Sequence, residues 1–264
     1  MKEYITYHQL IQNKRWKNET LLPDSCVLQL YVKEFYELMP KLMSCQNFRA
    51  LQFLRANITE IPSEAFELTQ LEWLSLANNK LRQLPKEIAK LQNLRFLDLS
   101  DNKIARLPEA LFACENLEQL YLDDNALIEL PESISKLKSL NTLYLSDNLL
   151  SRLPASFSKL RTLREVSICN NQISEISGDF SAWSQLRYLY LCDNPLQKIS
   201  NSLPVISLNL EEVNRLTSYL LSNQNLRELN IYDSDTFDSK EEMLSNISLE
   251  LQQKENLLIS EVDW

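Results

Sequence analysis

LRFLDLSDNKIARLP, residues 94–108, decides the fold of this chain, because the same fifteen-residue phrase returns every 23 residues. Clear copies start at Leu71, Leu117 and Leu140, weaker ones at Leu163 and Leu186, and a degenerate one at Phe48. Self-similarity at this period predicts a solenoid, in which each unit buries its apolar side only against its neighbours.

Each phrase predicts one short strand and one buried turn. Leu97 and Leu99 alternate with Asp98, which is the period of a half-buried strand, and stacked copies make a parallel sheet. The second half of each unit, such as residues 85–93, predicts a short helix or 3₁₀ turn on the convex side. An asparagine column is expected to satisfy buried backbone groups at the turn: Asn79, Asn102, Asn125, Asn148, Asn171 and Asn194.

These residues resemble the leucine-rich repeat, whose pattern L-x-x-L-x-L-x-x-N-x-L is matched at nearly every fixed position from residue 71 to 196. Val166 and Ile168 are conservative departures. The Leu-Pro that closes most units resembles the 23-residue class, which occurs in intracellular signalling scaffolds and in secreted effectors of intracellular bacteria. The resemblance implies an α/β solenoid with a curved parallel sheet inside and helical caps, and a protein-binding scaffold without catalysis of its own.

The sequence suggests three regions. Residues 1–47 are predicted to be an N-terminal helical cap, with an amphipathic helix that begins after Asp24 or Ser25 and runs to Leu42. An alternative is an F-box-like start, which would make the protein a substrate-recognition adaptor of a ubiquitin ligase, because Leu22-Pro23 precedes two apolar residues. The repeats are assigned to residues 48–236.

The repeat register slips after Ser200. Leu203 follows Leu186 by 17 residues, whereas Leu226 follows Leu203 by 23, so two degenerate strands are expected. Residues 237–264 are assigned to a C-terminal capping helix and tail, with a fraying end after Leu258. The Glu-rich tail with terminal hydrophobics is similar to C-terminal signals read by bacterial secretion machines, which favours the effector interpretation.

Composition limits the function. The net charge is −9, which disfavours nucleic acid, and no apolar run approaches the ~20 residues of a membrane span. No signal peptide is recognisable, so the protein is expected to be cytoplasmic or exported without one into a host cell cytosol. His8, in the expected cap, is the only histidine, so no Cys/His nucleophile pair can be assembled in the repeats, and Gly178 is the only glycine, so no glycine-rich phosphate loop can be built. A monomer without enzyme activity, cofactor or metal is expected.

The side chains between the inward leucines form the expected partner-binding face. Four columns of the six repeats that start at Leu71 to Leu186 give 24 positions, of which six are aromatic, seven acidic and none Lys or Arg, although the chain holds 27 basic residues. Aromatic anchors rimmed by carboxylates are typical of protein interfaces. Trp73 and Phe96 on adjacent repeats, and Tyr121 and Tyr144 likewise, are expected to stand roughly 5 Å apart. We therefore expect a partner that presents Lys or Arg around an apolar or aromatic centre, bound by these residues: Trp73, Phe96, Asp98, Tyr121, Asp123, Tyr144, Glu165, Tyr188 and Tyr190.

Two columns also have a structural interpretation. Cys169 and Cys192 share a column whose other members are mostly small, and the five scattered cysteines favour reduced, inert thiols over a disulfide or soft-metal site. The column directly before the asparagines suits turn chemistry, because Asp is common there. It holds Asp101, Asp124, Asp147 and Asp193.

Overall fold

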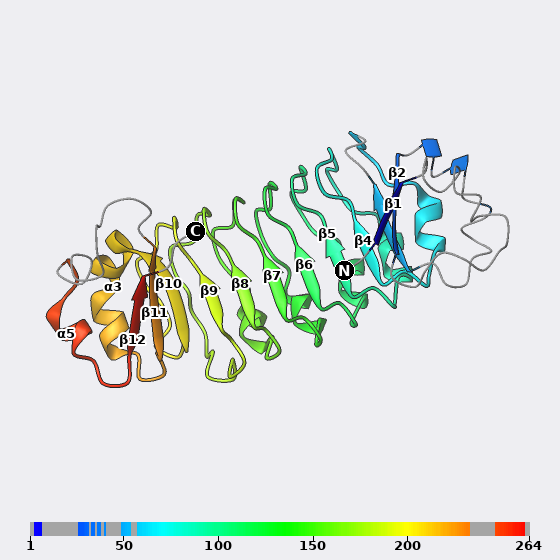
Figure 1. The fold of residues 1–264 in the computed structure, drawn as a ribbon. Helices are drawn as coiled ribbons and strands as arrows, with labels where there is room; N and C mark the ends of the chain where they lie inside the picture. Colours follow the sequence, from blue (N-terminus) through cyan, green and yellow to red (C-terminus); the bar gives the residue numbers. More distant parts are fainter. Residues whose placement is uncertain are drawn as a thin grey trace. The chain divides into compact units, whose positions relative to one another are not determined.

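The computed structural model describes residues 3–6, 26–31, 33, 34, 36, 37, 40, 49–53, 57–232 and 246–261 (Figure 1). The chain divides into two compact units. The first comprises Met1–Ala126 and Lys136–Leu140, and the second comprises Leu127–Ser135 and Asn141–Trp264.

The first unit is a row of parallel strands in chain order. They are β1 (Glu3–Thr6), β2 (Cys26–Leu30), β3 (Ala50–Phe53), β4 (Trp73–Ser75), β5 (Phe96–Asp98) and β6 (Gln119–Tyr121). Equivalent repeat positions pair, so that Leu74 lies opposite Leu97 and Leu97 opposite Leu120. The three leucines are fully buried, which confirms that the inward leucines form the core.

The second unit continues the pattern with parallel strands of its own, again side by side in chain order (Figure 1). They are β7 (Thr142–Tyr144), β8 (Glu165–Ser167), β9 (Tyr188–Tyr190), β10 (Val205–Asn209), β11 (Glu228–Tyr232) and β12 (Leu258–Glu261). Strand β10 is the early repeat expected from the register slip, and it pairs Ser207 with Tyr190. Both degenerate strands are therefore confirmed.

Short 3₁₀ helices fill the second half of most repeats, as predicted. They are η2 (Ser63–Glu67), η3 (Lys86–Lys90), η4 (Glu109–Ala113), η5 (Glu132–Lys136) and η6 (Ala155–Lys159). A proline stands directly before each, and its fixed φ suits the entry into the turn. In η3, Ile88 is fully buried while the lysines remain outside, so each turn closes the core on the side away from the open sheet face.

The asparagine ladder has the predicted role. The Asn102 side chain donates from Nδ2 to the carbonyl oxygens of Leu76, Leu99 and Ser100 at 3.0, 3.0 and 3.1 Å, and its Oδ1 accepts from the Leu81 amide at 3.0 Å. One buried side chain thereby satisfies four backbone groups in two adjacent repeats.

The residues directly before the asparagines adopt left-handed backbone. Asp101 has a φ of 51° and its equivalents lie between 50° and 58°. Asn and Asp are the non-glycine residues that tolerate this region best, which explains how a chain with one glycine makes these turns. The turn interpretation of the aspartate column is therefore supported.

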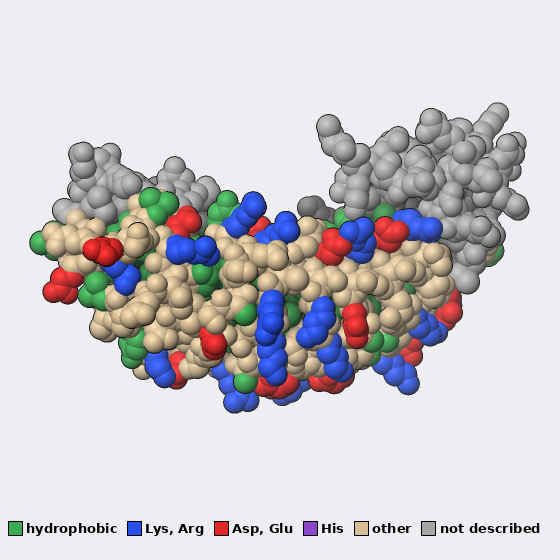
Figure 2. Space-filling model, turned by 90° about the horizontal axis from the view of Figure 1, so that it is seen from below, with side chains coloured by type: hydrophobic (Ala, Val, Ile, Leu, Met, Phe, Trp, Pro, Cys, Tyr) green, Lys and Arg blue, Asp and Glu red, His purple; other side chains and the backbone are tan. Residues whose placement is uncertain are grey.

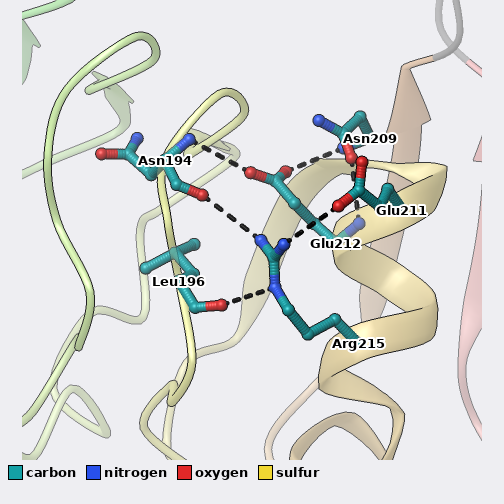
Figure 3. A network of polar contacts seen from close by, with 6 residues as sticks. All are labelled: Asn194, Leu196, Asn209, Glu211, Glu212 and Arg215. Atoms are coloured by element: carbon teal, nitrogen blue, oxygen red, sulfur yellow. Dashed lines mark hydrogen bonds and ion pairs between the residues drawn. The ribbon is translucent and has the colours of Figure 1, made fainter.

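Helix α3 (Leu210–Ser222), which the sequence analysis missed, follows the register slip and lies between β10 and β11. Figure 3 shows its anchoring: the buried Glu212 carboxylate accepts from the backbone amides of Asn194 and Asn209, and Arg215 donates to the carbonyl oxygens of Asn194 and Leu196. Asn209 and Glu212 also form a reciprocal capping box. These contacts fasten α3 to the turn that follows β9.

Two predictions about the ends of the chain are wrong in part. The helix expected after Asp24 or Ser25 is instead strand β2 at its start, where Leu28 pairs with Leu51, but the later residues 33, 34, 36, 37 and 40 are helical as predicted. Val27 and Leu28 of the F-box-like alternative lie in β2. The predicted C-terminal helix is reduced to α5 (Leu249–Gln252), and Leu258 begins β12, which pairs with β11. In both places backbone pairing with a neighbouring strand outweighs a helical apolar pattern. Beyond residue 31, the other residues of the predicted first helix lie outside the described residues, as do His8 and residues 237–245.

Candidate partner-binding face

Three aromatic rings from successive strands form a row in the first unit. Trp73 on β4 stacks on Phe96 of β5 with ring centroids 4.8 Å apart and planes at 11°, and Phe96 meets Tyr121 of β6 at 5.3 Å and 40°. We call Trp73, Phe96 and Tyr121 the aromatic row. The predicted closeness of Trp73 and Phe96 is confirmed, and it follows from the spacing of adjacent parallel strands.

Trp73 does not have the exposure expected of an anchor. Only 8% of the residue is accessible, because Ala50 and Phe96 pack against it. Phe96 and Tyr121 are half-buried. Trp73 is therefore a packed end of the row, beside Phe96 on the adjacent strand, and the accessible part of the row is contributed by Phe96 and Tyr121.

A carboxylate flanks the aromatic row. Asp98 on β5 accepts from the hydroxyl of Ser75 at 3.3 Å and from both the amide and the hydroxyl of Ser100, at 3.1 and 2.7 Å. No Lys or Arg within the described part of the chain forms an ion pair with it. Asp123, just after β6, is also half-buried. The serine contacts hold a negative charge in place beside the rings.

The remaining predicted residues lie in the second unit. The Tyr144 hydroxyl on β7 donates to Glu165 on β8. On β9, the Tyr188 and Tyr190 rings stack with centroids 6.1 Å apart and planes at 4°. Tyr188 is 45% exposed, the highest value among the predicted site residues. We call Tyr144, Glu165, Tyr188 and Tyr190 the tyrosine patch.

The structure therefore gathers the predicted residues into two groups, one in each unit. Asp98 and Asp123 accompany the aromatic row, whereas the tyrosine patch contains its own carboxylate. Tyr121 and Tyr144, which were expected to stand together, belong to different units.

The expectation of reduced thiols at Cys169 and Cys192 is wrong. The two residues form a disulfide between the turns that follow β8 and β9, with Cα atoms 4.7 Å apart. Equivalent positions on adjacent parallel strands lie within the Cα distance that a disulfide spans, so the shared column was itself the signal. Cys114 is a free thiol, and its burial raises its pKa to about 11, which keeps it neutral and unreactive.

Sequence reasoning also missed a basic column at the edge of the sheet. An arginine stands directly before each of three strands of the second unit: Arg164 before β8, Arg187 before β9 and Arg227 before β11. The sequence signal is the recurring Leu-Arg pair at the start of the weaker phrases, which lies one residue before the columns of the strand face.

Figure 2 shows one face of the molecule from below the view of Figure 1. Lys and Arg side chains lie beside Asp and Glu along it, and hydrophobic side chains appear only in small separate areas. Interspersed charge of this kind is typical of a solvated surface. In the described residues no helix combines the length and the hydropathy needed to cross a bilayer.

Comparisons with known proteins agree with this architecture. A model of a leucine-rich repeat region matches residues 25–128, and a leucine-rich repeat model matches residues 115–168 and 139–196. No curated protein matches the sequence.

Two solved structures illustrate the fold. A leucine-rich-repeat protein of Leptospira interrogans is 24% identical with a TM-score of 0.68, over 99% of this chain and 76% of that one. An internalin of Listeria monocytogenes is 18% identical with a TM-score of 0.55, over 89% of this chain and 78% of the other. At these identities the likeness concerns the fold alone.

Proposed function

Because the chain is a leucine-rich-repeat protein, and such domains generally bind protein partners, we propose that it is a non-catalytic scaffold that binds a partner protein on the open face of its sheet. The aromatic row and the tyrosine patch supply the contacts. The partner presents Lys or Arg around an apolar or aromatic centre.

The observation that carries the proposal is the aromatic row with its fixed carboxylate. Phe96 and Tyr121 are half-buried, whereas the leucines that alternate with them point to the opposite face and are fully buried, so part of each ring is available to a partner. Aromatic side chains that are already packed lose little conformational freedom on binding. Asp98, held by Ser75 and Ser100, adds a preorganised negative charge that favours a basic partner.

The test compares two double variants. A partner is captured from candidate lysates and purified, and its affinity is then measured for Tyr121→Ala with Tyr144→Ala and for Lys136→Ala with Lys159→Ala, whose lysines lie on 3₁₀ helices. The tyrosine pair should lose roughly 30-fold or more, the effect of a hot spot worth ~2 kcal/mol, and the lysine pair should bind as the wild type does. Loss of binding only in the lysine pair would place the site away from the open face.

Tyr144 needs a separate control because its hydroxyl holds Glu165. Tyr144→Phe keeps the ring and removes the hydrogen bond. If the ring is the contact, Tyr144→Phe should bind nearly as the wild type does, whereas an effect equal to that of Tyr144→Ala would assign the role to Glu165.

We further propose that the scaffold is a bacterial effector that acts on a host protein. The support for this proposal is the composition of the C-terminal segment, residues 249–258. Glu250 and Glu255 are exposed, and so are the hydrophobic Leu249 and Leu258, at 64% and 59%. Removing residues 240–264 would delete β12, so the test replaces exposed side chains instead. A reporter fusion that carries Glu250→Lys and Glu255→Lys should no longer be delivered into host cells, although it remains folded. Unchanged delivery of this variant would contradict the effector proposal.

A further inference from the structure

The charged column at the start of the strands differs between the two units. In the first unit it reads Arg49, Glu72, Arg95, Glu118, with alternating sign. Arg49 pairs with Glu72 at 3.3 Å and Arg95 with Glu118 at 2.5 Å. The hydrogen bond and the charge of Glu118 raise the pKa of Arg95. Each arginine of this column in the first unit is thus paired with a glutamate of the next repeat.

In the second unit the column contains arginine at Arg164, Arg187 and Arg227, and none of the three has a carboxylate within ion-pair distance among the described residues. Their backbones are fixed, since the Arg187 amide donates to the Arg164 carbonyl at 2.8 Å and the Arg227 amide to the Pro204 carbonyl at 2.9 Å. All three residues are exposed. Three like charges held in one row without counter-charges are a cost to folding, which suggests a binding role.

These arginines surround a cavity of about 600 Å³. It forms where the register slip places β10, which begins at Val205, between β9 and β11. The column position before β10 is Pro204, so the column lacks a long side chain at that step. Buried Val205 and Leu186 lie at the floor, and Tyr188 with polar Ser184 and Gln185 completes the rim. Glu228 is the single carboxylate in the lining, so the groove carries a net positive charge.

We propose that this arginine groove binds an acidic segment of a protein partner, through bidentate contacts between guanidinium groups and Asp or Glu side chains. The site adjoins the proposed partner-binding face, with which it shares only Tyr188, and has the opposite charge, so its arginines can be tested separately from that face. Arg164 and Arg227 stand three strand spacings apart, roughly 14 Å. An extended peptide of about four or five residues covers this length.

A single phosphate fits the groove less well. Its oxygens reach two neighbouring arginines at most, because adjacent strands are already about 4.8 Å apart and Pro204 interrupts the column. The apolar floor of Val205 and Leu186 also suits the aliphatic part of a peptide. The length of the arginine row and its floor therefore favour a peptide.

The experiment measures binding of a hexaglutamate peptide to the full chain by calorimetry at low ionic strength. The wild type should bind it, and Arg187→Gln with Arg227→Gln should weaken binding about tenfold or more. The matched control, Arg152→Gln with Arg161→Gln, removes two exposed arginines of the same unit outside the groove and should leave the affinity unchanged. Glu228→Gln should strengthen binding, because it removes the one carboxylate of the lining.

Specific outcomes overturn the proposal. Hexaglutamine must not bind, since it has the length without the charge. Equal losses of hexaglutamate affinity in the groove variant and in the control variant would mean that the peptide responds only to the total charge of the protein. Binding of inorganic pyrophosphate at Arg187 and Arg227 without binding of hexaglutamate would make the groove a phosphate site. All the substituted arginines are exposed, and unchanged circular dichroism spectra establish that the variants are folded.

Discussion

At the scale of single residues, the turn after each strand depends on two adjacent side chains with different tasks. Asn102 is buried and satisfies backbone groups of two repeats, whereas Asp101 is exposed and holds a left-handed φ of 51°. The first task needs an amide that donates and accepts, and the second needs a residue that tolerates this backbone region. Substitutions at the two sites should therefore fail for different reasons.

Asn102→Ala should lower the free energy of unfolding by about 1–3 kcal/mol, because it leaves buried carbonyl groups and the Leu81 amide without a partner. Urea denaturation measures this. Asn93→Ala is the control: the side chain of exposed Asn93 makes one hydrogen bond, to the Thr69 carbonyl, so its loss should change little. Equal costs at both positions would contradict the ladder's role.

Asp101→Gly and Asp101→Val should change the free energy of unfolding by different amounts. Glycine adopts the positive φ freely, so this variant should stay within about 1 kcal/mol of the wild type. The β-branched valine is strained there and should cost about 1–3 kcal/mol. Thermal unfolding distinguishes them, and a valine variant as stable as the glycine one would show that the turn has relaxed.

At the scale of elements, the second unit contains an α-helix and a disulfide in addition to the regular strands and 3₁₀ helices. Helix α3 follows the register slip and buries Val213, Leu216 and Leu220. Its capping residue Glu212 is buried, and the loss of solvation raises the pKa of its carboxyl despite the hydrogen bonds from Asn209 and Asn194. The disulfide between Cys169 and Cys192 links the turns of two adjacent strands.

Glu212 gives a signed pH dependence. Because its pKa is higher in the folded state than in the unfolded state, the folded state binds more protons between the two values, and the stability contributed by this group falls as pH rises through the folded pKa. Glu212→Gln removes the titration. The stability of the wild type relative to this variant should therefore fall as pH rises above the ordinary glutamate range, measured by denaturation at a series of pH values. A difference that is flat or rises with pH would contradict the burial effect.

The disulfide should stabilise the second unit. It closes a loop of 23 residues, for which chain-entropy models give roughly 3 kcal/mol. A reducing agent should lower the melting temperature of the wild type, whereas Cys169→Ser with Cys192→Ser should melt at the same temperature with and without it. Peptide mapping by mass spectrometry under non-reducing conditions should recover the two cysteines in one linked species.

At the scale of the whole molecule, charge is segregated by repeat position. The sheet-face columns carry acidic and aromatic residues and no Lys or Arg, whereas the column at the strand starts is paired in the first unit and basic in the second. The net charge of −9 therefore does not describe what an approaching partner meets. Local fields decide which partner surface is attracted to which column.

Association with the captured partner should show this segregation in its kinetics. The association rate should fall as salt rises, because a Debye length of ~8 Å at physiological ionic strength screens the steering charges. Tyr121→Ala should act mainly by speeding dissociation, since it removes a packed contact. Surface plasmon resonance at several salt concentrations separates the two rates, and an association rate independent of salt would contradict electrostatic steering.

The sequence alone determined the repeat, the inward leucines, the asparagine ladder, the aspartate turns and the closeness of Trp73 and Phe96. Each of these follows from contacts between equivalent positions of adjacent repeats, which a fixed period specifies. The shared column of Cys169 and Cys192 held the same information, and its disulfide was missed only because the scattered cysteines argued for thiols.

Only the tertiary structure decided what depends on neighbours outside the period. Residues 26–30 and 258–261 have apolar patterns compatible with a helix, and pairing with β3 and β11 made them strands. The burial of Trp73 depends on Ala50 in the degenerate repeat, and the arginine groove depends on where the slipped register puts Pro204 and Val205. A period specifies which residues stack, but the ends and irregular steps of a solenoid take their structure from the surfaces they meet.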